Sequence, residues 1–361
     1  MGILERDPDA TATTLERWLA TRNDVTDPTV GDVAIPGSTG WSNETIFFEA
    51  SWHGPEGQRD ERLVARIAPS DYRVFPDDTF HRQYTVMRAL AEHTDVPMAT
   101  THWFEHDDSW FGQPFWVMDR VDGDIPADAP PYAGEGWLAE ASEAQQARAW
   151  WSGIDAMARI HRVSVDALDL PSGTFPPADD QLDAALDHYE RFLTWAEEGE
   201  PHESARASLD HLRATRPAPS AAGPSLVWGD ARLSNLIYRD FEVITVLDWE
   251  MCGIGDPRLD LGWWIFADDA LTTGSGHVRL PGFPSAEETA AGWADRTGRS
   301  ADDLSWFVLL GGLRFTVIML RMGKLLHGMG FVPADFARDN LISQAMEQRL
   351  ATRSATDLPH R

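Results

Sequence analysis

One short segment of the chain combines residue types that suit phosphoryl transfer. Within residues 226–235, Asp230 is followed two residues later by a cation, Arg232, and five residues later by an amide, Asn235. An aspartate can orient an attacking hydroxyl and accept its proton, a cation can offset charge on the transferring group, and an asparagine carbonyl can bind magnesium. The spacing therefore indicates a phosphate-handling site between two short strands.

A second carboxylate lies at the end of an apolar strand. Asp248 directly follows the predicted strand 243–247, thirteen residues after Asn235. A strand fixes the position of the residue at its end, and carboxylate oxygens are ligands that magnesium prefers. Asp248 and Asn235 are therefore the candidate metal ligands.

These residues resemble the aminoglycoside phosphotransferase/choline kinase-like family. Residues 228–235 match its His-Gly-Asp-x-x-x-x-Asn pattern with Trp228 in place of His, and two further motifs follow at 248–250 and 255–262. The Trp-Gly-Asp-Ala-Arg form looks particularly like an actinobacterial branch of the family. The resemblance runs from about residue 35 to 264, and more loosely beyond.

The resemblance implies an α+β, bilobal protein-kinase-like fold. We expect a small β-rich N-terminal lobe over residues 1–120 and a larger, mostly helical C-terminal lobe over 121–361. The residue patterns agree with this, since β-branched and aromatic runs dominate the first part and helical periodicity the second. Strands are expected at 45–50, 62–67, 101–105, 114–118, 225–228, 236–238 and 243–247. Helices are expected at 13–22, 79–92, 143–163, 181–197, 202–213, 258–269, 286–296, 302–326 and 334–352.

The resemblance also assigns roles to the residues of the catalytic segment. It implies that Asp230 is the catalytic aspartate, that Arg232 faces the phosphates, and that Asn235 and Asp248 hold Mg²⁺. Asp256 is expected to cap a helix, Asp260 to brace the catalytic loop, and His161 to be structural.

The nucleotide contacts are expected in the N-terminal lobe. Met118 falls where the family's hinge binds adenine through its backbone, and Arg66 falls where a strand lysine holds the α- and β-phosphates. The phosphate-covering loop corresponds to Gly37, Ser38, Gly40 and Asn43.

Arg66 departs from the family pattern. Lys324 is the only lysine in the chain and is predicted to lie in a C-terminal helix, so an arginine must hold the triphosphate. Arginine is always charged and offers a bidentate fork. Its expected partner is Gln83 instead of the family's glutamate, and a Gln–Arg hydrogen bond is weaker than an ion pair.

Two functions follow from these residues. The first is Mg²⁺-dependent transfer of the γ-phosphoryl group of ATP or GTP to a free hydroxyl of a small molecule. The alternative, motivated by Arg66 and Gln83, is a nucleotide-binding pseudokinase with a regulatory role. The acceptor stays open among aminoglycosides, hydroxylated acyl groups, amino alcohols, sugars and macrolides. An acidic lining from Asp268 and Asp269 would favour polyamines, whereas a tryptophan-lined pocket would favour apolar acceptors.

Composition limits the other possibilities. The 361 residues are 43% hydrophobic, which suits a chain with two cores. The net charge of −28 disfavours nucleic acid and anionic membranes as partners. A single cysteine, Cys252, excludes an intramolecular disulfide and a multi-cysteine metal site. No signal peptide is expected, the apolar stretch 306–320 is predicted to be a buried helix, and the expected location is the cytoplasm.

Overall fold

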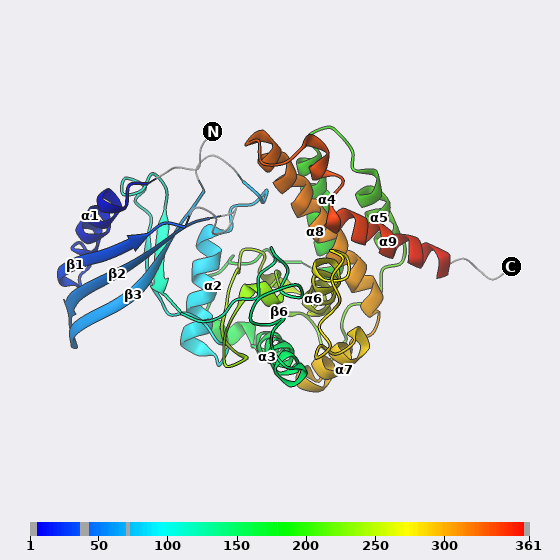
Figure 1. Ribbon diagram of the computed structural model, residues 1–361, viewed down its shortest axis with the longest axis horizontal. Helices are drawn as coiled ribbons and strands as arrows, with labels where there is room; N and C mark the ends of the chain where they lie inside the picture. Colours follow the sequence, from blue (N-terminus) through cyan, green and yellow to red (C-terminus); the bar gives the residue numbers. More distant parts are fainter. Residues whose placement is uncertain (1–5, 37–42, 70–72, 179, 357–361) are drawn as a thin grey trace. The chain divides into compact units, whose positions relative to one another are not determined.

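The structure, a computed structural model, divides into two compact units (Figure 1). It describes residues 6–36, 43–69, 73–178 and 180–356. The first unit consists of residues 1–91 and 99–122, and the second of residues 92–98 and 123–361. The short segment 92–98 therefore belongs to the second unit, although it precedes two strands of the first.

The first unit is a five-stranded antiparallel sheet with strand order β1-β2-β3-β5-β4. Its elements are α1 Pro8–Leu19, β1 Thr26–Ala34, β2 Glu44–Gly54, β3 Gly57–Ile67, α2 Phe80–His93, β4 Thr101–Glu105 and β5 Phe115–Asp119. Helix α1 begins earlier than predicted because Asp7 caps it, accepting from Ala10 N at 2.8 Å, and Pro8 suits the first turn.

Each face of this sheet is covered by one helix (Figure 1). Successive side chains of a strand point to opposite faces. Leu63, Ala65 and Ile67 of β3 belong to a buried cluster that also contains Leu15 and Trp18 of α1. The residues between them therefore point to the other face, where Trp116 packs against Phe80 and Tyr84 of α2.

The second unit is mostly helical, with short strand pairs. Its elements are α3 Glu143–Arg162, α4 Gln181–Glu197, α5 Glu203–Ala214, β6 Ser225–Val227, β7 Leu236–Arg239, β8 Glu242–Val246, β9 Gly253–Gly255, α6 Arg258–Leu271, α7 Ala286–Thr297, α8 Leu304–Gly328 and α9 Leu341–Thr356, with 3₁₀ turns at Val165–Leu168, Leu233–Asn235 and Ala334–Ala337. Strand β6 pairs with β9, and β7 forms a hairpin with β8.

Helix α8 is the central core helix of this unit. It packs against α4, α5, α6 and α9. By length and composition it is the one helix in the described ranges that could cross a membrane, yet two-thirds (67%) of its most apolar stretch is buried inside the structure. Gly262 of α6 permits the close approach, because a Cβ there would lie 2.3 Å from the backbone of Phe307.

The predicted C-terminal helix 334–352 is wrong in one respect. The structure breaks it into a 3₁₀ turn, Ala334–Ala337, and helix α9. Asn340 causes the break, since its Oδ1 accepts from Ile342 N at 3.0 Å and Ser343 N at 3.2 Å. An asparagine that caps a new helix competes with continuation of the old one.

Candidate active site

The loop that carries Asp230 is fixed by Asp260 from beneath. Asp260, on the first turn of α6, is fully buried, and its two oxygens accept from Trp228 N at 2.7 Å and Gly229 N at 2.8 Å. A carboxylate that accepts two backbone N–H groups holds a loop strongly. The expectation that Asp260 braces the catalytic loop is confirmed.

Asp260 is itself oriented by His161. His161 Nε2 lies 2.9 Å from Asp260 Oδ2, and Trp293 Nε1 donates to His161 Nδ1 at 3.0 Å. Because an indole nitrogen only donates, Nδ1 must accept and the ring proton must lie on Nε2. His161 therefore donates to Asp260, which confirms its structural role.

Close backbone packing fixes the turn at Gly229. Its φ is +94°, and a Cβ would lie 2.3 Å from the Met251 carbonyl oxygen, so only glycine fits. Buried Arg314 of α8 donates to the Gly229 carbonyl at 2.7 Å. Trp228, the residue that replaces the family histidine, is fully buried and donates from Nε1 to the Leu247 carbonyl at 2.7 Å. It thereby ties the loop to the residue before Asp248.

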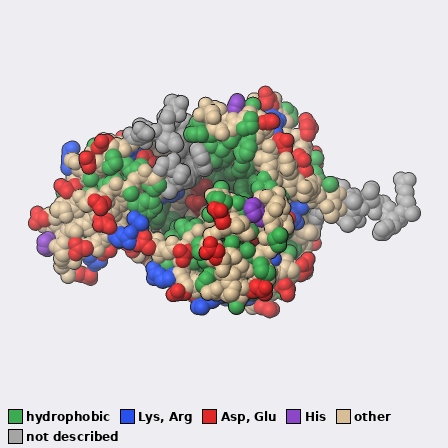
Figure 2. Space-filling view, viewed as in Figure 1, with side chains coloured by type: hydrophobic (Ala, Val, Ile, Leu, Met, Phe, Trp, Pro, Cys, Tyr) green, Lys and Arg blue, Asp and Glu red, His purple; other side chains and the backbone are tan. Residues whose placement is uncertain are grey.

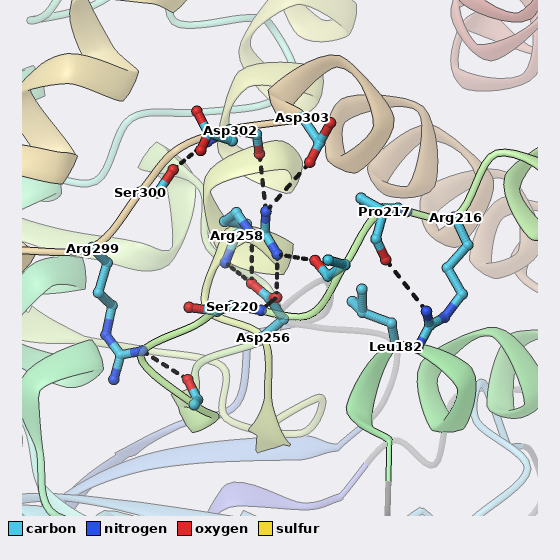
Figure 3. A network of polar contacts seen from close by, with 12 residues as sticks. Leu182, Arg216, Pro217, Ser220, Asp256, Arg258, Arg299, Ser300, Asp302 and Asp303 are labelled. Atoms are coloured by element: carbon cyan, nitrogen blue, oxygen red, sulfur yellow. Dashed lines mark hydrogen bonds and ion pairs between the residues drawn. The ribbon is translucent and has the colours of Figure 1, made fainter.

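The segment leading into β6 is anchored by a second buried ion pair (Figure 3). Asp256 accepts from Arg258 N, the first residue of α6, at 3.0 Å, but Pro257 occupies the N-cap position, so the expected cap is displaced by one residue. Arg258 also grips Asp256 through its side chain, at 3.0 and 2.7 Å. From there Arg258 donates to the Ala218 carbonyl at 2.9 Å, and Asp256 accepts from Ser220 N at 3.0 Å. These contacts order the Pro- and Ala-rich connection before the catalytic loop.

Arg232 lies between carboxylates. Its Nε donates to Asp230 Oδ1 at 3.0 Å, and its Nη1 donates to Asp128 Oδ2. Burial by itself would lower the pKa of the Arg232 guanidinium. The negative charges of Asp230, Asp128 and Asp248 outweigh burial, so the pKa is raised. The structure thus brings together Asp230, Arg232 and Asp248, which sequence reasoning selected, with Asp128, which it did not.

The two candidate metal ligands are joined through the backbone. Asn235 is buried, its Nδ2 donates to the Asp230 carbonyl at 3.0 Å, and its own carbonyl accepts from Leu247 N at 2.9 Å. Asp248 comes next, with a φ of +54° that turns the chain away from the strand.

This donor set fits magnesium. Because Nδ2 of Asn235 donates to the Asp230 carbonyl, Oδ1 is the atom of this side chain that could bind a cation. Three carboxylates, those of Asp230, Asp128 and Asp248, act on the single cation Arg232, so the cluster is acidic. Magnesium is usually held by one or two carboxylates together with substrate phosphates. The described residues contain no group of three or more His, Cys, Asp or Glu side chains that could hold a metal ion.

The nucleotide residues predicted in the first unit lie on its sheet. Arg66 pairs with Thr45 across β3 and β2, points to the face that α2 covers, and donates to Thr45 Oγ1 at 2.9 Å. Gln83 is buried in α2 on that side. Asn43 is buried, whereas Gly37, Ser38 and Gly40 lie outside the described residues.

Met118 lies inside β5 with strand partners on both sides. It pairs with Val64 of β3 and with Thr101 of β4. Asp119 N then donates to the Thr100 carbonyl at 2.9 Å. Residues 120–123 belong to no strand, although Arg120 N still donates to the Arg62 carbonyl of β3 at 2.7 Å.

The acids expected to attract a polyamine are already paired. Asp268 is buried, accepts from Tyr132 Oη at 2.8 Å and from Arg279 Nε at 2.6 Å, and lines a narrow pocket beside Arg232 and Ser234. Burial raises the pKa of its carboxyl, although Arg279 opposes this. Asp269 is paired with Arg349. Asp268 therefore lines a pocket, but its charge and that of Asp269 are each paired with an arginine.

Asp128 is the functional candidate that sequence reasoning missed. It lies in the Pro-, Ala- and Gly-rich stretch 124–137, where single acids are common in loops. Its partner Arg232 is 104 residues away, so no local spacing signals the contact.

Comparison with known proteins places the chain in a family. The model of the phosphotransferase enzyme family matches residues 34–297. Among curated proteins, probable acyl-CoA dehydrogenase IBR3 of Arabidopsis thaliana is 26% identical over 231 residues, and acyl-CoA dehydrogenase family member 10 of mouse is 29% identical over 230 residues. Each match covers 62% of this chain but only 26% and 19% of those proteins.

Solved structures show the fold. A predicted aminoglycoside phosphotransferase from Ralstonia eutropha superposes with a TM-score of 0.71 at 23% identity, covering 94% of this chain and 98% of that one. Aminoglycoside phosphotransferase APH(4)-Ia, in a complex with ADP and hygromycin B, gives 0.57 at 13% identity, covering 96% and 98%. The α+β, bilobal protein-kinase-like fold expected from the sequence is confirmed, and the chain belongs to the phosphotransferase enzyme family.

Proposed function

We propose that this protein is a magnesium-dependent phosphotransferase that moves the γ-phosphoryl group of ATP or GTP to a hydroxyl of a small molecule. The observation that supports the proposal is the hydrogen-bonded set of Asp230, Asn235 and Leu247, which joins the backbone of Asp230 to the residue before Asp248. Membership of the phosphotransferase family supports the same reaction class.

Asp230 is the residue that handles the acceptor hydroxyl. Oδ1 is engaged by Arg232, so Oδ2 is the oxygen that orients the hydroxyl and takes its proton as the new oxygen–phosphorus bond forms. Arg232 offsets charge beside the transferring group. Asn235 Oδ1 and Asp248 would hold Mg²⁺, which supplies charge neutralisation on the nucleotide phosphates when bound.

The first unit contributes the nucleotide contacts in this proposal. Arg66 binds the α- and β-phosphates, and the hydrogen bond that it donates to Thr45 Oγ1 orients its fork in place of the family's glutamate. Asn43, together with the predicted positions Gly37, Ser38 and Gly40, is assigned to the phosphates in this proposal. Because the backbone of Met118 is paired within the sheet, the adenine contact belongs to residues 120–123 as well as to Met118.

The acceptor is better described as a hydroxylated acyl compound than as a polyamine. Asp268 and Asp269, which would have attracted a polyamine, are each neutralised by an arginine. The curated relatives are named acyl-CoA dehydrogenases, and this chain matches only a part of each. In those relatives, a region similar to this chain is part of a protein named for acyl-CoA chemistry. This association favours an acyl compound as the acceptor of the phosphoryl group.

A screen of hydroxylated compounds tests the function. ADP release with Mg-ATP is measured across hydroxyacyl compounds, amino alcohols, sugars, macrolides and aminoglycosides. We expect release with a hydroxyacyl acceptor, and Asp230→Ala should abolish it while calorimetry still detects Mg-ATP. Nucleotide binding without transfer to any acceptor would favour the pseudokinase that Arg66 and Gln83 suggest. Absence of both, with Mg-ATP and with Mg-GTP, would contradict the phosphotransferase.

A further inference from the structure

The loop that carries Asp128 is anchored at two points, to strand β7 and to helix α6. Asp124 exchanges two backbone hydrogen bonds with Tyr238 of β7, both at 2.8 Å. Eight residues on, Tyr132 is buried and bonds to Asp268 of α6 at 2.8 Å. Asp128 lies midway between these anchors, so its carboxylate has a defined position although the segment belongs to no helix or strand.

Asp128 and Asp230 hold the same guanidinium from two sides. Arg232 Nη1 donates to Asp128 Oδ2, and Arg232 Nε donates to Asp230 Oδ1. A guanidinium that faces a single carboxylate commonly forms a bidentate pair, in which it donates one hydrogen bond to each of the two oxygens. On this edge of a guanidinium the fork uses Nε and Nη2, as in the pair of Arg258 with Asp256. In Arg232 only Nε donates to Asp230, and to one oxygen, while Asp128 holds Nη1 at the other end of the guanidinium.

The second oxygen of Asp128 argues against a purely structural role. Among the described residues, Asp128 Oδ1 is a buried atom without a hydrogen-bond partner. Buried carboxylate oxygens are normally satisfied, and leaving one unsatisfied costs free energy. A brace for the loop alone would not require a carboxylate with one unsatisfied oxygen.

We propose that Asp128 is a positioning residue for phosphoryl transfer: it holds Arg232 away from a bidentate pair with Asp230, so that Asp230 Oδ2 stays available to the acceptor hydroxyl. This inference rests on the proposed function. Without Asp128, Arg232 closes on both oxygens of Asp230 and blocks the base.

Kinetics test the consequence for turnover. Water serves as the acceptor, and inorganic phosphate released from Mg-ATP is measured for Asp128→Asn, Asp128→Glu and the control Glu135→Gln, which removes an exposed charge from the same loop. We expect kcat to fall by about 10- to 100-fold in Asp128→Asn, the size of effect that misplacing a catalytic group produces. The KM for ATP should stay within about threefold, because nucleotide contacts persist. Asp128→Glu should recover part of kcat, and Glu135→Gln should match the parent.

A spectroscopic measurement tests the geometry without turnover. The Arg232 Nε–H resonance is assigned in ¹H–¹⁵N spectra by its absence from Arg232→Lys. In Asp128→Asn this resonance should move, whereas Glu135→Gln should leave it in place. An unmoved resonance, or a parental kcat in Asp128→Asn, would overturn the positioning role. If the parent protein neither binds nor hydrolyses Mg-ATP or Mg-GTP, the proposed function fails, and the spectra still decide whether Asp128 holds Arg232.

Discussion

At the scale of single residues, the position of Asp230 depends on groups that never meet a substrate. Trp293 fixes the tautomer of His161, His161 donates to Asp260, and Asp260 accepts from Trp228 N and Gly229 N. The chain of donors and acceptors is fully buried. Each group in this chain acts either as a donor or as an acceptor at its contact. A substitution that reverses this role leaves a buried polar group unsatisfied, because no water reaches it to form the missing hydrogen bond.

Asp260→Asn tests this dependence. The new amide group would place N–H donors against a backbone N–H that needs an acceptor, so we expect a loss of about 3 kcal/mol in unfolding free energy. Phosphoryl transfer should fall at least about tenfold, because the Gly229–Asp230 turn shifts. Urea unfolding and ADP release measure the two effects.

Asp269→Asn is the matched control on the same helix. Its side chain is 47% exposed and paired with Arg349, so its loss should cost no more than about 1 kcal/mol. Equal destabilisation by the two substitutions would show that Asp260 does not brace the loop.

At the scale of elements, sequence periodicity predicted most of the helices and strands. It failed where an element or a contact is defined by residues that are distant in the sequence. The period-2 and period-3.6 patterns located β2, β3, α4 and α6 because each buries one face. Strand β9 was missed, since Gly253 and Gly255 are poor strand formers and only the pairing with β6 defines it. The pairing of Asp128 with Arg232 was missed for the same reason: it exists only in three dimensions.

The cap of α5 makes that helix sensitive to acid. His202 Nδ1 accepts from Ala205 N at 3.4 Å, and a protonated ring could not accept. Burial lowers the pKa of His202, with a further contribution from Arg338 that Glu347 and Glu197 oppose. Since the folded-state pKa lies below the unfolded value of about 6.5, the unfolded chain binds the proton first. This stabilising contribution is therefore complete above pH 6.5 and is lost as the pH falls below it.

His202→Asn should remove this acid sensitivity. An asparagine cap accepts from the backbone at any of these pH values. Urea unfolding at pH 7.5 and pH 5.5 should show the parent losing about 1 kcal/mol more than the variant, the typical value of an N-cap. All other titrating groups are common to both proteins, so identical pH dependence would mean that the cap stays formed when His202 is protonated.

At the scale of the whole molecule, charge is the dominant surface property. The chain has 58 acidic and 30 basic residues, so 28 acids remain even if every cation is paired. Acidic side chains are scattered across the face shown in Figure 2 instead of gathering in one patch. Arginine pairs with both side chains exposed, such as Arg148–Glu242, contribute little stability. We therefore expect repulsion among the excess acids to outweigh attraction within such pairs and to oppose folding.

Salt should consequently stabilise this protein. Raising NaCl from about 0.01 M to about 0.5 M shortens the Debye length from roughly 30 Å to a few ångströms, which screens repulsion between distant acids first. We expect the urea midpoint at pH 7.5 to rise with salt, with urea chosen because it adds no ions. Near the isoelectric point of about 4.6 the excess charge vanishes, and the same addition of salt should leave the midpoint unchanged or lower it. A midpoint that falls with salt at pH 7.5 would show that ion pairs, and not the unpaired acids, dominate the electrostatic free energy of folding.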